Sequence, residues 1–391
     1  MNSPQVEAAE AAPALDKPAA HPALPSKERL LSLDVFRGFT LLGMVLVNSH
    51  PNGIYPGLGH VRWNGWGFAD LIFPFFVFIV GVAIPYSFAN RMARGESHRH
   101  LFWQILRRSV LLFVVGVALN GYPYFNLSTL RVMNVLQRIA ICYFLASILY
   151  VYVRMQVKSI VRLSAAILVL YFILMKYVPV PGYGAGVLEP VGNWGNYIDQ
   201  HLIAGRMQHP QWEGKSLLGS FPALVTMLMG LLTGLYLRTP RPAYEKLTHL
   251  YLYGSLSMAA GVVWSAWFPI NQHLWTSSLV LFMGGVALLF LASCYYLVDV
   301  RKSTWWTMPF IIFGMNSIAV WVFSQMGMKT LMAINIAPAG QAAVSLWKAG
   351  GNSLAYYLGR MNGSLAFAIL YDLFWLGVMG ILYRRRIFIK L

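Results

Sequence analysis

This sequence of 391 residues has little charge and little cysteine. Charged residues make up 11% of the chain, whereas soluble domains carry about 25%, so the class of water-soluble proteins is excluded. The two cysteines, Cys142 and Cys294, lie in apolar stretches, which argues against a disulfide framework. Neither a CxxC nor an HExxH spacing occurs, and we therefore expect no metal site.

Long apolar runs are the main feature of the chain. Hydrophobic residues form 58% of it, and they gather in runs of about 20 residues, the length at which a helix crosses a bilayer. These runs predict an all-α, polytopic transmembrane helical bundle of about ten spans. The predicted spans are 31–48, 67–89, 105–121, 132–153, 160–178, 217–237, 249–268, 275–298, 307–327 and 364–383.

The segments outside the spans differ in composition. Residues 1–28 are rich in Ala and Pro, which predicts a disordered cytoplasmic tail rather than a signal peptide. Residues 29–391 then form one transmembrane domain. This domain includes two long outward loops, 179–216 and 328–363, and the second is expected to carry a short surface helix near 352–361.

The few charges are unevenly distributed. Lys and Arg outnumber Asp and Glu by 30 to 13, for a net charge of +17. The basic residues are concentrated in alternate connections and near the C-terminus. By the positive-inside rule, both termini are cytoplasmic, and 49–66 and 179–216 face outward. Much of the positive charge is therefore a topology signal, and it does not indicate a nucleic acid partner.

Three acidic residues lie within the predicted spans, where charges are costly enough to indicate function by default. Asp34 and Arg37 are three residues apart on one helix face, which predicts a mutual ion pair at the cytoplasmic mouth. Asp372 has no partner nearby in the sequence. The third, Asp70, lies one turn inside the second span.

Asp70 follows a histidine closely. His60 precedes it by ten residues, across a Gly-containing turn that can fold back. A carboxylate beside an imidazole fixes the tautomer of the ring and stabilises its charged form, which suits a general base. A capping role for Asp70 at the N-terminus of the helix is the alternative.

Further polar residues gather mostly near the outer ends of the spans, which predicts a cavity that opens outward. One of them, Asn48 at the end of the first span, could supply an amide donor to an oxyanion. The others are Gln137 and Arg138 in the fourth span, Asn271 and Trp275 in an outward turn, and Asn316 within the ninth span.

Five stretches match a known superfamily of transmembrane acyltransferases. They are SLDVFRGFTLLGMVLVN (32–48), HVRWNGWGFADLIFPFFVFIVGV (60–82), VLQRIAICYFLA (135–146), PINQHLWTSSLVL (269–281) and FGMNSIAVWV (313–322). Because these stretches span most of the chain in order, the sequence resembles the bacterial relatives of heparan-α-glucosaminide N-acetyltransferase.

The resemblance implies an integral-membrane enzyme that moves acetyl from cytosolic acetyl-CoA to the amine of glucosamine or of a glucosamine-containing saccharide. His60 matches the family's catalytic histidine, which acts either as a base or as a transient acetyl carrier. Asn48 and Asp70 match its asparagine and its aspartate. The family's PEGLLST appears here as WEGKSLLGS (212–220), which leaves the role of Glu213 open.

The candidate site therefore has three parts. We expect His60, Asp70 and Asn48 to be catalytic, Trp63, Asn64, Gln137, Glu213, Asn271 and Trp275 to bind the acceptor, and Arg37, Arg138 and Asn316 to bind acetyl-CoA.

An alternative function is an amino-sugar or N-acetylglucosamine permease without acyl transfer, although the lack of an internal repeat counts against it. Besides the two substrates, the expected partners are the lipid bilayer and, as an option, a second copy of the chain in a homodimer. The expected location is the bacterial inner membrane.

Overall fold

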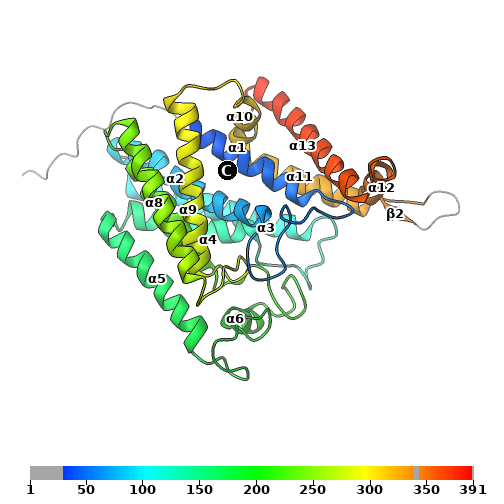
Figure 1. Ribbon diagram of the computed structural model, residues 1–391, viewed down its shortest axis with the longest axis horizontal. Coiled ribbons are helices and arrows are strands. Elements are labelled where there is room, and N and C mark those ends of the chain that lie inside the picture. Colours follow the sequence, from blue (N-terminus) through cyan, green and yellow to red (C-terminus); the bar gives the residue numbers. More distant parts are fainter. Residues whose placement is uncertain (1–29, 338–342, 390–391) are drawn as a thin grey trace, which may run out of the picture.

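The computed structural model describes residues 30–337 and 343–389, so the tail predicted at 1–28 lies outside the described residues. The described chain is a bundle of long helices (Figure 1), which confirms the all-α polytopic prediction. Within these ranges the only named strands are the short antiparallel pair β1 (Asn335–Ile336) and β2 (Val344–Ser345).

Each of the ten predicted spans coincides with helical structure. The helices are α1 (Leu31–Asn48), α2 (Phe68–Ala93), α3 (His98–Gly121), α4 (Val135–Val151), α5 (Val157–Tyr177), α7 (Ser220–Leu237), α8 (Ala243–Trp264), α9 (Ser277–Cys294) with its π-helical continuation η1 (Tyr295–Val300), α10 (Met308–Met315), α11 (Ser317–Ala333) and α13 (Arg360–Arg384). Of the described helices, 7 are long and apolar enough to cross a membrane, or 8 if α10 and α11 count as one span. The number of ten spans stays a prediction.

The ninth predicted span is wrong as a straight helix. It is broken between α10 and α11, whose axes differ by 85°. The break is at Asn316, whose side-chain amide donates to the Ile387 carbonyl oxygen at 3.2 Å and accepts from the Ile389 backbone N–H at 2.9 Å. A side chain that bonds a distant backbone in this way competes with helix continuation.

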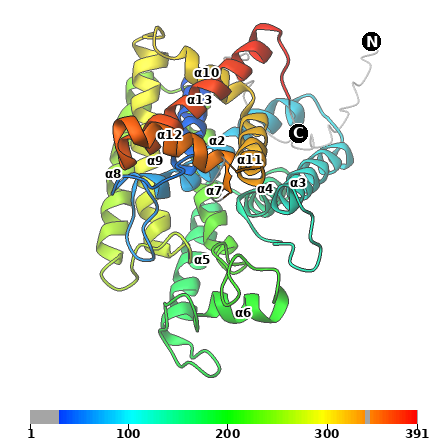
Figure 2. The same ribbon diagram turned by 90° about the vertical axis from the view of Figure 1, so that its right-hand side faces the viewer.

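The outward loops contain two short helices. α6 (Trp194–Leu202) lies within the loop predicted at 179–216, and α12 (Leu346–Leu358) overlaps the surface helix predicted near 352–361 but begins earlier. In Figure 2, α5 extends away from the bundle and α6 lies near its far end. The two loops that are predicted to face outward therefore each contain a short helix.

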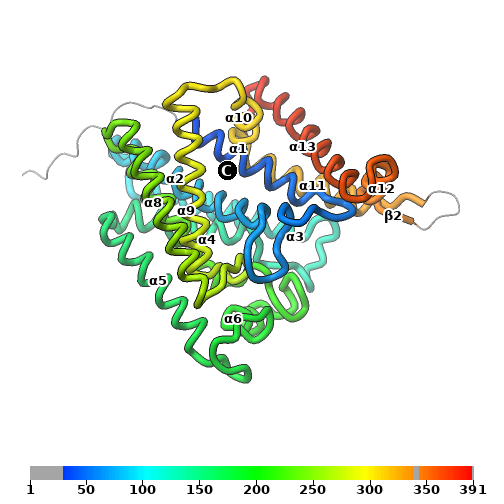
Figure 3. Tube along the Cα trace, in the orientation of Figure 1, coloured from blue at the N-terminus to red at the C-terminus, as the bar shows by residue number. Residues whose placement is uncertain are grey.

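Connections that are predicted to share a membrane face do meet. At the outer end, the Trp63 indole N–H donates to the Leu188 carbonyl oxygen at 2.9 Å. At the inner end, Arg238 donates to the Asn90 side chain at 3.3 Å. Figure 3 shows the loop that follows α1, drawn in blue, running between the α12 end of the bundle and α6. The loop that carries His60 is therefore in contact with another outer segment.

Helices α2 and α7 pack closely in the core, because glycines allow their backbones to approach. A Cβ atom added at Gly230 would lie 2.0 Å from the Phe78 carbonyl oxygen, and one added at Gly81 would lie 2.0 Å from the Met227 carbonyl oxygen. Neither backbone oxygen can move without moving its helix. This contact fixes α2, which carries Asp70.

Substitution Gly230→Leu is expected to destabilise the folded protein by about 3 kcal/mol or more, since the side chain would overpack a backbone contact. Thermal unfolding followed by size-exclusion chromatography in detergent measures this loss. Gly377→Leu in α13 is the matched control, because no atom lies within 4 Å of a Cβ added there. Equal melting temperatures for the two variants would contradict the packing account.

Candidate active site

The carboxylate of Asp70 makes two kinds of contact. One oxygen lies 2.6 Å from Nδ1 of His60. The other accepts from the backbone N–H groups of Gly67 at 2.9 Å and Val61 at 3.1 Å. Asp70 is 2% exposed. The sequence left two interpretations of Asp70 open, a helix cap and a partner of His60. Asp70 makes both kinds of contact, each through a different carboxylate oxygen.

His60 lies at the boundary between protein and solvent. Its side chain is 48% exposed, whereas its carboxylate partner is buried. Because an ionised carboxylate only accepts, the neutral ring carries its proton on Nδ1, and Nε2 is left as a basic nitrogen. This pair can accept a proton from a group that reaches Nε2.

The loop around His60 is held by two other outer segments. The Gly65 backbone N–H donates to the Ile270 carbonyl oxygen at 2.8 Å, and Gly65 adopts φ +105°, which favours glycine. The Asn271 side-chain amide donates to the Asn64 side-chain oxygen at 3.1 Å. Asn64 and Asn271, predicted to bind the acceptor, are therefore joined to each other in positioning the loop.

Aromatic and imidazole rings form a cluster beside this loop. Trp63 stacks on His273 with ring centroids 5.1 Å apart, and it meets Trp212 edge-on at 5.4 Å. His209 stacks on the other tryptophan, Trp212, at 4.3 Å. Burial, with the nearby positive charge of Lys215, lowers the pKa of His273 to about 4, so this ring is neutral at neutral pH. The sequence placed these residues in outward loops without showing that they meet.

Glu213 is fully engaged by its own protein. Its carboxylate accepts from both Nε and Nη2 of Arg131, the first at 3.1 Å, and from the backbone N–H groups of Gln208 and Lys215, each at 2.9 Å. Such a paired, hydrogen-bonded carboxylate suits a loop anchor. The open role of Glu213 is therefore best explained as positioning of residues 208–215.

Three of the predicted binding residues lie deeper, behind the loops. Arg138 and Gln137 are fully buried, and Arg138 donates to the Ser216 carbonyl oxygen at 2.7 Å and lies over the Trp275 ring at 5.0 Å. Trp275 adopts φ +57°, a strained conformation for a bulky residue. Its indole N–H donates to Thr226 at 3.1 Å. These contacts form a rigid support beneath the outer loops.

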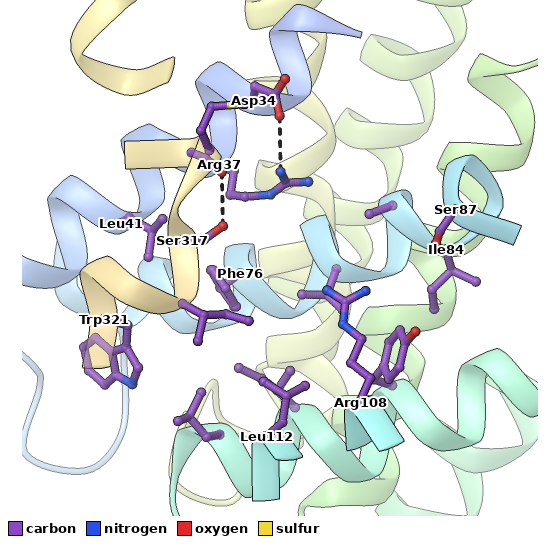
Figure 4. Close-up of a pocket in the computed structure, with 18 of the residues that line it drawn as sticks. Asp34, Arg37, Leu41, Phe76, Ile84, Ser87, Arg108, Leu112, Ser317 and Trp321 are labelled. Carbon is purple, nitrogen blue, oxygen red and sulfur yellow. Dashed lines mark hydrogen bonds and ion pairs between the residues drawn. The ribbon is translucent and has the colours of Figure 1, made fainter. Parts of the chain in front are cut away.

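A cavity of about 650 Å³ lies within the bundle, with arginines at the end that is predicted to face the cytoplasm (Figure 4). Arg37 and Arg108 project towards it from α1 and α3, and the Asp34–Arg37 pair predicted from sequence is present at 3.2 Å. Arg91 completes the basic part of the lining. Deeper lining residues are apolar and come from four helices: Leu41, Met44, Phe76, Leu136, Ile139 and Trp321.

The structure separates the predicted acetyl-CoA residues. Arg37 lines the cavity, whereas Arg138 and Asn316 are not among its described lining residues. Asn316 is buried, with its amide bonded to the C-terminal segment. Asn48 is exposed at the outer end of α1, where its amide donates back to the Met44 carbonyl oxygen at 2.7 Å. In the described chain Asn48 has no hydrogen bond to the His60–Asp70 pair.

Lys215 lies close to these residues and was not among those predicted from the sequence. Its Nζ lies over the ring of Phe73, 5.3 Å from the ring centroid. Phe73 follows Asp70 by about one turn of α2. A signal existed, because Lys215 and Arg206 are the only Lys or Arg residues in the predicted outward loop 179–216.

Much of the chain is similar in sequence to known proteins. Residues 29–246, more than half of the chain, match the family model for heparan-alpha-glucosaminide N-acetyltransferase, catalytic. The chain is 31% identical to heparan-alpha-glucosaminide N-acetyltransferase of Homo sapiens over 348 residues, which is 75% of this chain and 52% of the relative. It is 30% identical to the Mus musculus protein of the same name over 351 residues, 76% of this chain and 53% of the relative. The chain spans about half the length of these relatives, and it belongs to their family.

Proposed function

We propose that this family member is an integral-membrane N-acetyltransferase that moves acetyl from cytosolic acetyl-CoA to the amine of glucosamine or of a glucosamine-containing saccharide. The observation that carries the proposal is the His60–Asp70 pair at 2.6 Å, in a bundle that also contains a cavity of about 650 Å³. The names of the human and mouse relatives support the reaction type and the class of acceptor.

In this proposal His60 is the general base. The amine nitrogen attacks the thioester carbonyl carbon, and the carbonyl electron pair moves to oxygen. Nε2 of His60 takes the proton of the amine, and Asp70 stabilises the imidazolium through Nδ1. When the adduct collapses, the C–S bond breaks and the CoA thiolate leaves with its electron pair, taking the proton from His60. The products are the N-acetyl sugar and CoA.

The donor is proposed to enter through the 650 Å³ cavity. Arg37, Arg91 and Arg108 line its basic part, where phosphate groups of CoA are stabilised by charge-assisted hydrogen bonds. The apolar lining towards Met44 and Phe76 suits the less polar arm that carries the thioester. This assignment retains Arg37 and replaces Arg138 and Asn316 by two cavity arginines.

Substitution Arg108→Gln is expected to raise KM for acetyl-CoA by about 10- to 100-fold, the value of one charge-assisted hydrogen bond, with kcat little changed. Initial rates at saturating glucosamine measure this. Arg107→Gln is the matched control, because Arg107 is the adjacent, exposed residue of α3 and is not in the cavity lining. The same KM for both variants would contradict the proposed donor site.

The acceptor is proposed to bind at the outer ring cluster. Trp63, Trp212 and His273 present partly exposed ring surface beside His60. Rings with an apolar face and a polar edge suit a sugar, which has apolar C–H faces and hydroxyl edges. The cluster places such a ring next to the base that would deprotonate its amine.

One assay tests the reaction directly. Purified protein is mixed with labelled acetyl-CoA and glucosamine, and labelled N-acetylglucosamine is quantified. The proposal predicts product and stoichiometric CoA. A protein that forms no product, while vesicles containing it accumulate unmodified amino sugar, would be a permease and would overturn the proposal.

A further inference from the structure

Lys215 has its backbone fixed on both sides by buried groups. Its own N–H donates to Glu213, which Arg131 holds. The next carbonyl group, that of Ser216, accepts from the buried Arg138 guanidinium at 2.7 Å. A Cβ added at Gly214 would lie 3.6 Å from Nδ1 of His273, so the segment also touches the ring cluster. The side chain of Lys215 is thus directed by the fold towards Phe73 on α2.

The charged groups that face this lysine come from four segments. Asp70 on α2, Glu213 in its own loop, Arg131 before α4 and Arg138 within α4 all act on its charge. Both acids are engaged elsewhere, Asp70 with His60 and two backbone amides, and Glu213 with Arg131. Among the ion pairs of the described residues, none includes Lys215.

A half-buried ammonium group without an anionic partner is costly to keep. Burial, followed by the positive charges of Arg138 and Arg131, lowers the pKa of Lys215 to about 7. A purely structural role is the alternative, in which Lys215 packs its aliphatic side chain on Phe73 and directs its amine to water. That explanation does not account for its place in one cluster with the base pair, since Lys215, Asp70 and His60 all act on the charge of His273.

We propose that Lys215 is the oxyanion donor of the acyl-transfer site: its ammonium group donates a hydrogen bond to the acyl oxygen as the tetrahedral adduct forms beside His60. This role rests on the proposed function. Lys215 keeps its proton throughout, while the amine proton passes to His60 and then to the CoA thiolate. A preorganised cation that meets negative charge only in the transition state lowers the barrier without strengthening substrate binding.

The activity test compares Lys215→Met and Lys215→Arg with wild type across pH 5.5 to 9. Removing one oxyanion donor is expected to lower kcat by about 10²- to 10³-fold in Lys215→Met, with both KM values nearly unchanged. Wild-type activity should fall as the pH rises above about 7, because the lysine then loses its proton. Lys215→Arg should retain part of the activity and lose this alkaline decline, since arginine stays protonated.

Two measurements do not depend on turnover. Labelling with acetic anhydride, read by peptide mass spectrometry, should reach half of its maximal rate at Lys215 near pH 7, with the exposed outer residue Lys348 as the reference amine. The melting temperature of Lys215→Met should equal or exceed that of wild type, because a half-buried charge without an ion-pair partner is removed. A lower melting temperature with an unchanged pH profile would show a structural lysine and overturn the proposal.

The remaining outcomes separate the two proposals. If the wild-type activity rises through pH 7 and Lys215→Met loses this activity, Lys215 acts as a base. That result would overturn the donor role. If wild type transfers acetyl and Lys215→Met matches it, only the role of Lys215 fails. If wild type transfers no acetyl at all, the proposed function fails and the oxyanion role with it.

Discussion

Substitution His60→Ala is expected to lower kcat for acetyl transfer by about 10²- to 10⁴-fold, the usual contribution of a positioned general base. The side chain is half exposed and contributes little packing, so the melting temperature should change little. KM for acetyl-CoA should also stay near the wild-type value, because His60 is not among the residues that line the donor cavity. Initial rates at saturating substrates, with a melting curve for each variant, measure these effects.

A second outer histidine supplies the control for this substitution. His201 is exposed on α6, where its ring contacts the Tyr197 carbonyl oxygen at 2.7 Å, with no carboxylate partner among the described residues. His201→Ala is expected to retain full activity. An equal loss of rate in both variants, or none in His60→Ala, would mean that the Asp70-linked imidazole is not the reaction centre.

Substitution Asp70→Asn is expected to lower kcat by about 10²-fold or more while the protein stays folded. An asparagine can accept the backbone N–H groups of Gly67 and Val61 through its oxygen, so the helix start is retained. Its neutral amide no longer stabilises an imidazolium, and its NH2 group then faces Nδ1 of His60 as a donor, which disfavours the tautomer that carries the proton on Nδ1. Rates and melting temperatures, measured together, separate the two roles of this residue.

Asp70→Ala is the informative companion variant. Loss of a capping side chain costs about 1 kcal/mol of stability, so alanine should lower the melting temperature where asparagine does not. Both variants should be nearly inactive. An active Asp70→Asn enzyme alongside an unstable Asp70→Ala enzyme would reduce Asp70 to a helix cap and would leave His60 without an orienting partner.

The fold was largely predictable because a membrane chain must satisfy its backbone within helices, so long apolar runs report helices directly. The break at Asn316 was not predictable, because it depends on contacts with Ile387 and Ile389. These residues lie 71 and 73 positions further along the chain. Nothing within the apolar run itself marks that partner.

Within the site, the His60–Asp70 pair was accessible from sequence because only ten residues separate its members. The pairing of Arg131 with Glu213 spans 82 positions, and its geometry depends on how the outer loops fold. The approach of Lys215 to Phe73 joins an outer loop to α2 in the same way. Local spacing therefore identified the base pair, whereas its surroundings required the three-dimensional arrangement.

Transfer across the bilayer is the central claim, and sided proteoliposomes test it most directly. Glucosamine is trapped inside, labelled acetyl-CoA is added outside, and N-acetylglucosamine is measured in the lumen. The account predicts labelled lumenal product with wild type and at least a 100-fold smaller rate with His60→Ala, the lower bound of about 10² for a general base. Labelled product that forms only when both substrates are on the same side would contradict it, as would lumenal glucosamine that leaves unmodified.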